Sequence, residues 1–443
     1  MAKVLFLPIG VGLAHTGRSI MIARELEKRG VDVAFGAGGD AVALLEKEHF
    51  PFFPLPEFKR AVYERKVKNN NFFIYSRKTI ETYVRAELDL YDKVKPDLVV
   101  FDTRITAKIS SQIAKIPVIS VNNSDVTPYY DYSKTKFPAT TSLEKFLPPR
   151  ILALLDRGYG QRLLRIIGPK LMQAVLLAMI IKCSQALLKL GYKFSRDPYQ
   201  FFSGDLTLLA DIPQYRPVTR LPDNYKMVGP IFWDGGEKLP CWQKEVEGKK
   251  EIIYVTAGGT GDKEIFLKIL EFLEETNFTV VATAGNTLKP SAVRFDNPNI
   301  FVTDIVPGAW IMKRAKLVIF PGGNLTAYQA LSFGVPQICT PFHIDQEDNA
   351  NQLVRLGTGI MLNPRLNFSK DALLNAVGRI MVDEKYKANA KRMQKILAGY
   401  HGAKTAAEEI IKYIDCHCDP ESASWRIEGE ATAIRRDPAE AGQ

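Results

Sequence analysis

The chain has 443 residues, 46% of them hydrophobic and 24% charged, and its 59 Lys and Arg against 49 Asp and Glu give a formal net charge of +10 at pH 7. This length predicts two or three ordinary domains, and this composition excludes disordered, collagen-like and coiled-coil proteins. The positive charge indicates an anionic partner, which could be a phosphate ligand, an anionic lipid or a nucleic acid. Five scattered cysteines favour a reducing compartment over a disulfide framework.

The N-terminal part alternates predicted strands and helices. An apolar run at 4–9 predicts a first strand, a glycine-rich turn follows it, and helical periodicity over 19–30 predicts the first helix. Because only one lysine precedes the apolar start, we assign it to a buried strand and not to a secretion signal. Further apolar runs at 96–102 and 116–122 predict more strands of a doubly wound parallel sheet.

Residues 150–196, called the basic helical region below, are mostly helical in pattern and carry nine basic residues and one acid. Their longest uncharged apolar stretch, 171–181, is shorter than the ~20 residues that cross a bilayer, so no transmembrane segment is expected. Two interpretations stay open. These helices pack on the N-terminal domain and line an acceptor cleft, or they lie on an anionic membrane surface.

The alternation of patterns predicts two domains. The first covers 1–210 and includes the basic helical region, and a linker rich in proline and turn residues covers 211–250. The second alternating domain covers 251–415, and its closing helix is expected to cross back to the first domain. The polar tail at 416–443 is expected to be poorly ordered.

Two glycine-rich turns in the second domain are candidates for a ligand site. Residues 256–261 leave a strand and enter a helix, so that their backbone amides and the helix N-terminus could hold a phosphate. The second turn follows the strand that ends at Phe320, and we expect Thr326 to start the next helix, which carries Gln329. Polar residues of this kind beyond the carboxyl ends of parallel strands predict a ligand site.

The segment 321–360 resembles the C-terminal signature of the UDP-glycosyltransferase superfamily with the GT-B fold, roughly H-G-G-x-G-T-x-x-E-A-L, then G-V-P, then P-x-x-x-D-Q-x-x-N-A. The positions in register are Gly322, Gly323, Thr326, Ala330, Leu331, Gly334, Val335, Pro336, Pro341, Asp345, Gln346, Asn349 and Ala350. Residues 229–230 and 306–307 resemble the family's Gly-Pro and V-P-Q elements. At the N-terminus, His15 with residues 23–30 resembles its H-x-x-P…LA-x-x-L-x-x-R-G-H pattern.

The resemblance implies an α/β GT-B protein, in which two Rossmann-like doubly wound domains face each other across a cleft. It implies inverting, metal-independent transfer of a sugar from a nucleotide sugar, a UDP-hexose or UDP-N-acetylhexosamine, to an acceptor hydroxyl. His15 would be the general base and Asp102 would orient it. The donor-binding residues it implies are Gly258, Gly259, Thr260, Val306, Gly322, Gly323, Asn324, Thr326, Gln329, Asp345 and Gln346. No metal ion and no cofactor is expected besides this co-substrate.

Four positions depart from the family pattern. Pro321 replaces a phosphate-contacting histidine, Leu325 a small residue, Gln329 a ribose-binding glutamate and Gly308 a base-contacting glutamine. A proline has no N–H to offer the diphosphate. Two alternatives therefore stay open beside the transferase: a non-catalytic GT-B homologue that acts as a binding or auxiliary subunit, and a nucleotide-sugar epimerase.

The remaining expectations concern partners and lesser candidates. The acceptor is a small molecule or a lipid, and the protein is expected to be cytoplasmic, with peripheral contact to the inner face of the membrane if the basic helical region binds lipid. Nucleic acid is disfavoured because no binding module is recognised. His343 is either a sugar-site residue or a solvent-facing loop residue. Cys416, His417 and Cys418 superficially suggest metal, but these few adjacent candidates make a zinc site improbable.

Overall fold

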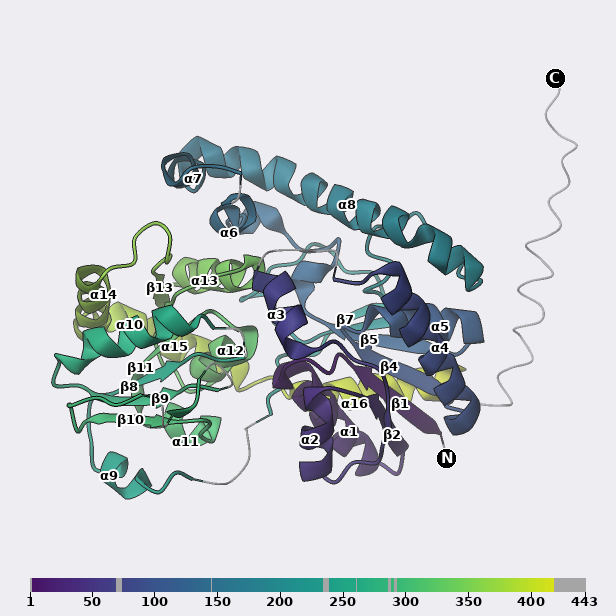
Figure 1. Cartoon of the computed structure of the whole chain (residues 1–443), viewed down its shortest axis with the longest axis horizontal. Helices are drawn as coiled ribbons and strands as arrows, with labels where there is room; N and C mark the ends of the chain where they lie inside the picture. The colour runs from purple at the N-terminus through teal and green to yellow at the C-terminus, as the bar shows by residue number, and fades with distance from the viewer. Residues whose placement is uncertain are drawn as a thin grey trace, which may run out of the picture.

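The computed structural model describes residues 2–68, 74–144, 146–233, 239–259, 261–285, 288–290 and 293–417. Over these residues the chain forms a seven-stranded sheet of order β3-β2-β1-β4-β5-β6-β7 and a six-stranded sheet of order β10-β9-β8-β11-β12-β13. All the strand pairs within these two sheets are parallel. The doubly wound parallel architecture expected from the sequence is therefore confirmed in both domains (Figure 1).

The elements of the N-terminal domain are β1 (Lys3–Pro8), α1 (Leu13–Glu27), β2 (Asp32–Ala37), α2 (Asp40–Lys47), β3 (Phe52–Pro54), α3 (Arg60–Lys68), α4 (Arg77–Val94), β4 (Leu98–Asp102), α5 (Ile105–Ala114), β5 (Val118–Asn122), the 3-10 helices η1 (Ser124–Val126) and η2 (Tyr132–Lys134), α6 (Ala139–Leu143), α7 (Pro149–Leu155), α8 (Gly158–Lys189), β6 (Leu206–Leu209) and β7 (Tyr225–Met227).

The elements that follow are α9 (Gln243–Glu247), β8 (Ile252–Thr256), α10 (Lys263–Glu274), β9 (Thr279–Thr283), β10 (Ile300–Thr303), α11 (Gly308–Met312), β11 (Ala315–Phe320), α12 (Asn324–Ser332), β12 (Gln337–Cys339), α13 (Ile344–Leu356), β13 (Gly359–Met361), α14 (Lys370–Val382), α15 (Glu384–Leu397) and α16 (Gly402–His417).

The central strands are buried on both faces, as the continuous apolar runs in the sequence require. Every residue of β4, β5 and β8 is buried. Helices cover each sheet from both sides, so that the residues of one strand alternate between two separate hydrophobic clusters. This burial explains why the strands are rich in Val, Ile, Leu and Phe and do not alternate with polar residues.

The closing helix α16 crosses back to the N-terminal domain, as the sequence predicted. It packs against α1 through Ala406, Ala407 and Ile410, which belong to the same core cluster as Ile20. The crossing passes close to the earlier interdomain connection, because a Cβ atom at Gly402 would lie 2.3 Å from the carbonyl oxygen of Pro230. Only glycine permits this approach of two backbones.

The expected linker and tail boundaries differ from the structure. Within 211–250, the short strand β7 pairs with β6 and extends the first sheet, and α9 adds Val246 to the core of the second domain. Three strand residues among prolines and turn residues are too few to give a period that the sequence reveals. At the other end α16 continues through Cys416 and His417, whereas 418–443 lies outside the described residues.

The basic helical region forms α7 and α8, and α8 is longer than expected. Its portion Gly158–Lys182, of 25 residues and mean hydropathy 1.7, is long and apolar enough to cross a membrane, by length and composition only. The sequence criterion missed this length, because the uncharged run stops at Lys170 whereas the helix continues through it. The inner side of α8, including Leu176 and Met179, packs into a core cluster beside α4.

Candidate functional site

A cavity of about 810 Å³ lies between the two domains and is lined by residues of both. Its walls come from the loops that follow β1 and β5 in the first domain and β8, β11 and β12 in the second. The pairs β1 with β4 and β8 with β11 mark the points where the strand order of each sheet reverses. Open α/β sheets bind ligands at such points, beyond the carboxyl ends of the strands.

His15 lies on the first turn of α1 and contacts Asp102 at the end of the neighbouring strand β4. The Nδ1 atom of His15 is 2.7 Å from Oδ1 of Asp102, whose side chain is fully buried, whereas the His15 side chain is 29% exposed. The strand register pairs Asp102, the last residue of β4, with Pro8, the last residue of β1. The carboxylate therefore lies at the same sheet edge as the turn and helix that follow β1 and carry His15. Because Asp102 engages Nδ1, Nε2 is the ring nitrogen that can accept a proton on the cavity side.

Arg18, one helical turn after His15, holds the other side of the Asp102 carboxylate. Its Nε and NH2 groups donate to Oδ2 and Oδ1 of Asp102, each at 2.7 Å, and its NH1 group donates to Oδ1 of Asn123 at 2.8 Å. Although burial alone would raise the pKa of Asp102, the charges and hydrogen bonds of Arg18 and His15 lower it to about 2. Asp102 is therefore a carboxylate at neutral pH. Sequence reasoning missed Arg18, although its i+3 spacing from His15 was available.

The glycine-rich turn after β8 lies in the cavity, but the helix behind it is not open to an anion as expected. Gly258 has a φ of 59° and lines the cavity with Gly259, whereas Thr260 lies outside the described residues. The N-terminus of α10 is already capped, because Oδ1 of Asp262 accepts from the backbone N–H groups of Glu264 and Ile265. The helix terminus is therefore not available to a phosphate, and within the turn the N–H of Gly258 already donates to Oγ1 of Thr256 at 3.1 Å, which leaves Gly259 as the turn residue for this role.

The turn after β11 presents an open helix N-terminus. The helix α12 begins at Asn324, two residues before the Thr326 that the sequence suggested, and no side chain caps it. Gly322 has a φ of 112°, and a Cβ atom there would lie 2.7 Å from the carbonyl oxygen of Gln346. The first backbone N–H groups of α12 can therefore bind an anion in the cavity, which Gly323, Asn324 and Thr326 line.

Asn349, which fell in register with the family signature, supports this turn from behind. Its Nδ2 group donates to the carbonyl oxygen of Gly322 at 2.9 Å, and its Oδ1 atom accepts from Arg216 at 2.8 Å. Asn349 is fully buried and does not line the cavity. Its contact with the turn is structural.

Gly308 and Gln329, two positions that depart from the family pattern, lie next to each other in the structure. A Cβ atom on Gly308 would lie 1.9 Å from Nε2 of Gln329. The absence of a side chain at position 308 therefore makes room for Gln329, and both residues line the cavity beside Val306. The structure explains this pair of changes together, whereas the sequence presented them as independent.

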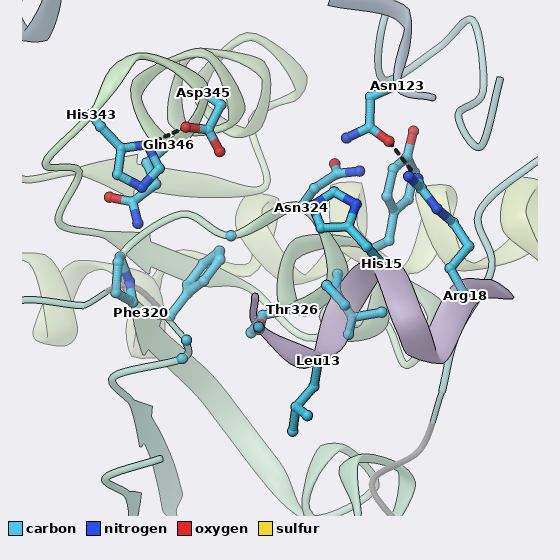
Figure 2. A pocket seen from close by; sticks show the side chains of 18 of the residues that line it. Leu13, His15, Arg18, Asn123, Phe320, Asn324, Thr326, His343, Asp345 and Gln346 are labelled. Atoms are coloured by element: carbon cyan, nitrogen blue, oxygen red, sulfur yellow. Dashed lines mark hydrogen bonds and ion pairs between the residues drawn. The ribbon is translucent and has the colours of Figure 1, made fainter. Parts of the chain in front are cut away.

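His343, Asp345 and Gln346 lie on the cavity wall formed by the start of α13 (Figure 2). His343 forms an ion pair with Asp345 and is only 5% exposed, so the alternative that it is a solvent-facing loop residue is wrong. Gln346 is buried, and its Oε1 atom accepts from the backbone N–H of Phe342 at 2.9 Å. Figure 2 shows these residues across the cavity from His15 and Arg18.

A buried charge cluster near the cavity links the domains, and the sequence gave no signal for it. Arg216 forms ion pairs with Asp125, Asp211 and Asp348, and its side chain is fully buried. Tyr130 donates to Asp348 at 2.7 Å across the domain interface. The pKa of Asp125 is raised to about 7, chiefly because the carboxyl group is buried. Arg216 lowers this pKa, whereas the nearby carboxylates of Asp348 and Asp211 raise it further.

Arg60 brings a further cation to the cavity wall. It lies on α3, and its NH2 group donates to the carbonyl oxygen of Gly259 at 3.3 Å, across the two domains. Its NH1 group also pairs with Asp40 at 2.9 Å. Over the described residues, no group of three or more His, Cys, Asp or Glu side chains is arranged to hold a metal ion.

Comparison with known proteins identifies what this arrangement resembles. Residues 268–412 match the family model described as the C-terminal domain of erythromycin biosynthesis protein CIII-like proteins. A PGL/p-HBAD biosynthesis glycosyltransferase of Mycobacterium tuberculosis is 30% identical over 396 residues, which cover 88% of this chain and 87% of that protein. A PGL/p-HBAD biosynthesis rhamnosyltransferase of Mycobacterium bovis is 30% identical over 405 residues, covering 88% of this chain and 83% of that protein.

Solved structures agree on the fold. The spinosyn forosaminyltransferase SpnP superposes with a TM-score of 0.67 at 17% identity, covering 94% of this chain and 99% of that one. The glycosyltransferase VinC, solved in complex with DTDP, gives a TM-score of 0.64 at 16% identity, covering 93% and 99%. These similarities confirm the α/β fold with two facing domains.

Proposed function

The chain belongs to the UDP-glycosyltransferase superfamily and is a glycosyltransferase with the GT-B fold, and from this premise we propose that it transfers a sugar from a nucleotide sugar to an acceptor hydroxyl with inversion of the anomeric configuration. The observation that carries the proposal is the 2.7 Å contact between His15 and Asp102 at the wall of the interdomain cavity. It supplies a general base from the first domain in the same cavity that the anion-binding turns of the second domain line.

His15 acts as the base in this proposal. With Nδ1–H donated to Asp102, the Nε2 lone pair removes the proton of the acceptor hydroxyl as its oxygen attacks the anomeric carbon. The bond from that carbon to the nucleoside diphosphate breaks in the same displacement, which inverts the configuration. The buried carboxylate of Asp102 then stabilises the imidazolium that forms, while Arg18 keeps this carboxylate ionised and oriented.

The departing diphosphate is stabilised by backbone groups. Gly259 and the residues at the uncapped N-terminus of α12 line the cavity, so their backbone N–H groups can donate to the diphosphate, and the dipole of α12 adds partial positive charge. Thr326 adds a hydroxyl donor on the same turn. No step of this mechanism requires a metal ion or a cofactor, and we propose that the transfer proceeds without either.

The remaining donor residues follow from their places around the cavity. We assign Val306 and Gln329 to the nucleoside, with the side chain of Gln329 toward the ribose, and Asp345 with Gln346 to the hydroxyls of the transferred sugar. The resemblance in sequence suggests a uridine nucleotide, whereas VinC was solved with DTDP and the Mycobacterium bovis relative is named a rhamnosyltransferase. The donor is thus proposed to carry a pyrimidine nucleoside diphosphate, and UDP and dTDP sugars are the two candidates.

The wall that the first domain contributes to the cavity is largely apolar. Its apolar residues include Leu13, Tyr63, Ile74, Met172, Leu176 and Phe202, beside the charged Arg18, Arg60, Glu64 and Asp125. Such a wall fits a hydroxyl carried on a hydrophobic or aromatic molecule, because a fully polar acceptor would leave this surface without complementary contacts.

The test is a transfer assay over UDP and dTDP hexoses, deoxyhexoses and N-acetylhexosamines with a panel of hydrophobic phenols and alcohols. The product's anomeric configuration is read by NMR. Transfer with inversion supports the proposal, and transfer with retention contradicts it. Nucleotide-sugar binding without turnover would instead support a non-catalytic binding subunit, which Pro321 favours because it offers no N–H to the diphosphate. Interconversion of the sugar without transfer would identify an epimerase.

A further inference from the structure

The outward side of α8 is apolar, whereas the outward side of a helix that faces water usually carries polar residues. Six large side chains on this side, called the α8 apolar face below, are 42–70% exposed: Leu163, Ile166, Ile167, Leu171, Leu177 and Ile181. At about 100° per residue these six positions fall along one side of the helix. Most of the exposed large hydrophobic side chains in the described part of the chain lie on residues 146–188, so this is a concentrated patch.

The opposite side of α8 is also apolar and already has its partner. Leu176, Met179, Ile180 and Leu187 are buried in a cluster beside α4. A helix that is apolar on all sides is expected inside a large core or in contact with lipid. Since one side of α8 is packed and the other is exposed, the helix is suited to lie along a lipid surface. Crossing the bilayer would require that the packed side detach from the domain.

The charges around the α8 apolar face match an anionic surface. Residues 150–196 carry nine basic residues and one acid, a net charge of +8. Arg162, Lys170, Lys182 and Lys189 are exposed on α8 itself, interspersed with the apolar side chains. Lysine and arginine can lie with their stems on apolar surface and their charges at the level of lipid headgroups.

A hollow at the start of α8 has the charge and size for a headgroup phosphate. It measures about 380 Å³ and is lined by Lys136, Arg157, Arg162 and Arg165 together with Gln161 and Asp156. Asp156 pairs with Lys136 at 3.3 Å, so one carboxylate stands against four cations. Gln161, Arg162 and Arg165 of this hollow belong to the first turns of α8, whereas Lys136, Asp156 and Arg157 belong to the segments that precede the helix.

The position of α8 leaves this surface accessible. Figure 1 shows α8 as the outermost layer of the molecule, with α6 and α7 at one of its ends and the N-terminal sheet beneath it. On its inner side, Met172 and Leu176 line the interdomain cavity. The helix thus separates the cavity from the outer surface.

We propose that the α8 apolar face docks, parallel to the surface, on a lipid bilayer that contains anionic lipids. A second copy of the chain is a poorer occupant, because pairing two such surfaces would oppose two sets of like charges with one acid in each region. The docked bilayer lies beside the acceptor wall, from which an amphiphilic acceptor would reach His15. This last consequence rests on the proposed function, whereas the docking does not.

Flotation of the purified full-length chain with vesicles tests the docking without requiring any turnover. We expect the protein to float with phosphatidylcholine vesicles that contain phosphatidylglycerol, to float much less with pure phosphatidylcholine, and to be released as salt rises. Absence of flotation at low salt overturns the proposal. So does flotation that is independent of both salt and phosphatidylglycerol, since the charges would then have no part in it.

Variants locate the contact. The double variant Ile166→Glu with Ile181→Glu, at side chains 64% and 70% exposed, should lose flotation, whereas the control Val382→Glu, at an 83% exposed side chain of the second domain, should retain it. Arg162→Glu with Lys182→Glu should also lose it, and the matched control Arg392→Glu with Lys395→Glu, on exposed positions of α15, should not. Thermal unfolding verifies that each variant is folded.

Equal flotation of a variant and its control would contradict the assignment to α8. If the wild-type chain fails to float and is a dimer that Ile166→Glu with Ile181→Glu makes monomeric, this surface is a subunit interface and the proposal is wrong. The assay of sugar transfer is a separate experiment. Failure of the docking would therefore not contradict the proposed function, and failure of the proposed function would not contradict the docking.

Discussion

Arg18 binds Asp102 through two hydrogen bonds of 2.7 Å, one to each carboxylate oxygen, while His15 contacts the same carboxylate. The aspartate is therefore shared between a permanent cation and the proposed base. This geometry holds the carboxylate in one orientation, and it also means that the loss of Arg18 affects both the stability of the fold and the reaction.

Replacement of Arg18 by methionine should destabilise the protein by roughly 3–5 kcal/mol, because it leaves a buried carboxylate without its main partner. The sign of the pH effect follows from the pKa of Asp102, which is lowered from 3.8 to about 2. Its stabilising contribution is present above 3.8 and is lost as pH falls toward 2. In Arg18→Met the folded-state pKa of Asp102 should rise toward or above 3.8, so this loss of stability in acid should shrink or disappear, as urea unfolding between pH 2 and pH 6 would measure. Arg18→Lys, which keeps the positive charge, is the control and should lose less stability than Arg18→Met.

The cluster around Arg216 predicts an unusual pH dependence near neutrality. Because the pKa of Asp125 is raised from 3.8 to about 7, this group binds a proton more readily in the folded state. Its contribution therefore makes the fold more stable as pH falls from 8 toward 5. Asp125→Asn should remove this dependence and gain about 1 kcal/mol at pH 8 relative to the wild type, measured by thermal unfolding at both pH values. An identical pH profile for the two proteins would show that Asp125 is already ionised.

The contact between Gly308 and Gln329 predicts that the two positions are coupled in donor binding. Gly308→Ala should displace Gln329, since the new Cβ would overlap its amide, and should weaken nucleotide binding by about 1 kcal/mol, roughly fivefold in Kd. Gln329→Ala should weaken it similarly, and the double variant should be no worse than Gln329→Ala alone. Isothermal titration with UDP and dTDP measures this cycle. Additive losses would contradict the coupling.

Pro321 offers a gain-of-binding prediction. It lines the cavity beside Gly323, where the family pattern has a histidine that contacts phosphate. Pro321→His should add a hydrogen-bond donor and tighten binding of the nucleoside diphosphate by about 1.5 kcal/mol, roughly tenfold in Kd. Pro321→Ala restores only the backbone N–H and serves as the control. Equal affinities of the histidine and alanine variants would show that this position does not face the diphosphate.

The sequence predicted the features that depend on local patterns. Buried strands such as β4 and β8 have continuous apolar runs, and the glycines at 258 and 322 mark turns that need positive φ angles. The Asp262 cap of α10 also had a local signal, an aspartate just before the helical run, which our phosphate assignment overlooked.

The features that the sequence did not predict depend on contacts between distant residues. Arg216 meets Asp125 and Asp348, which are 91 and 132 positions away along the chain, and no periodicity connects them. The relation between Gly308 and Gln329 likewise appears only when α11 and α12 lie side by side. The apolar outer face of α8 was hidden because the sequence does not tell which side of an all-apolar helix is packed.

Comparing turnover and donor binding in His15→Ala tests the central claim most directly. Once a transferable sugar is identified, the account predicts that kcat falls by roughly 10²–10⁴-fold, because the general base is lost. The Kd for the nucleoside diphosphate should stay unchanged, because His15 belongs to α1 of the first domain, whereas the turns proposed to bind the diphosphate belong to the second domain. A variant that keeps a near-normal kcat, or one that loses nucleotide binding together with turnover, would contradict the account.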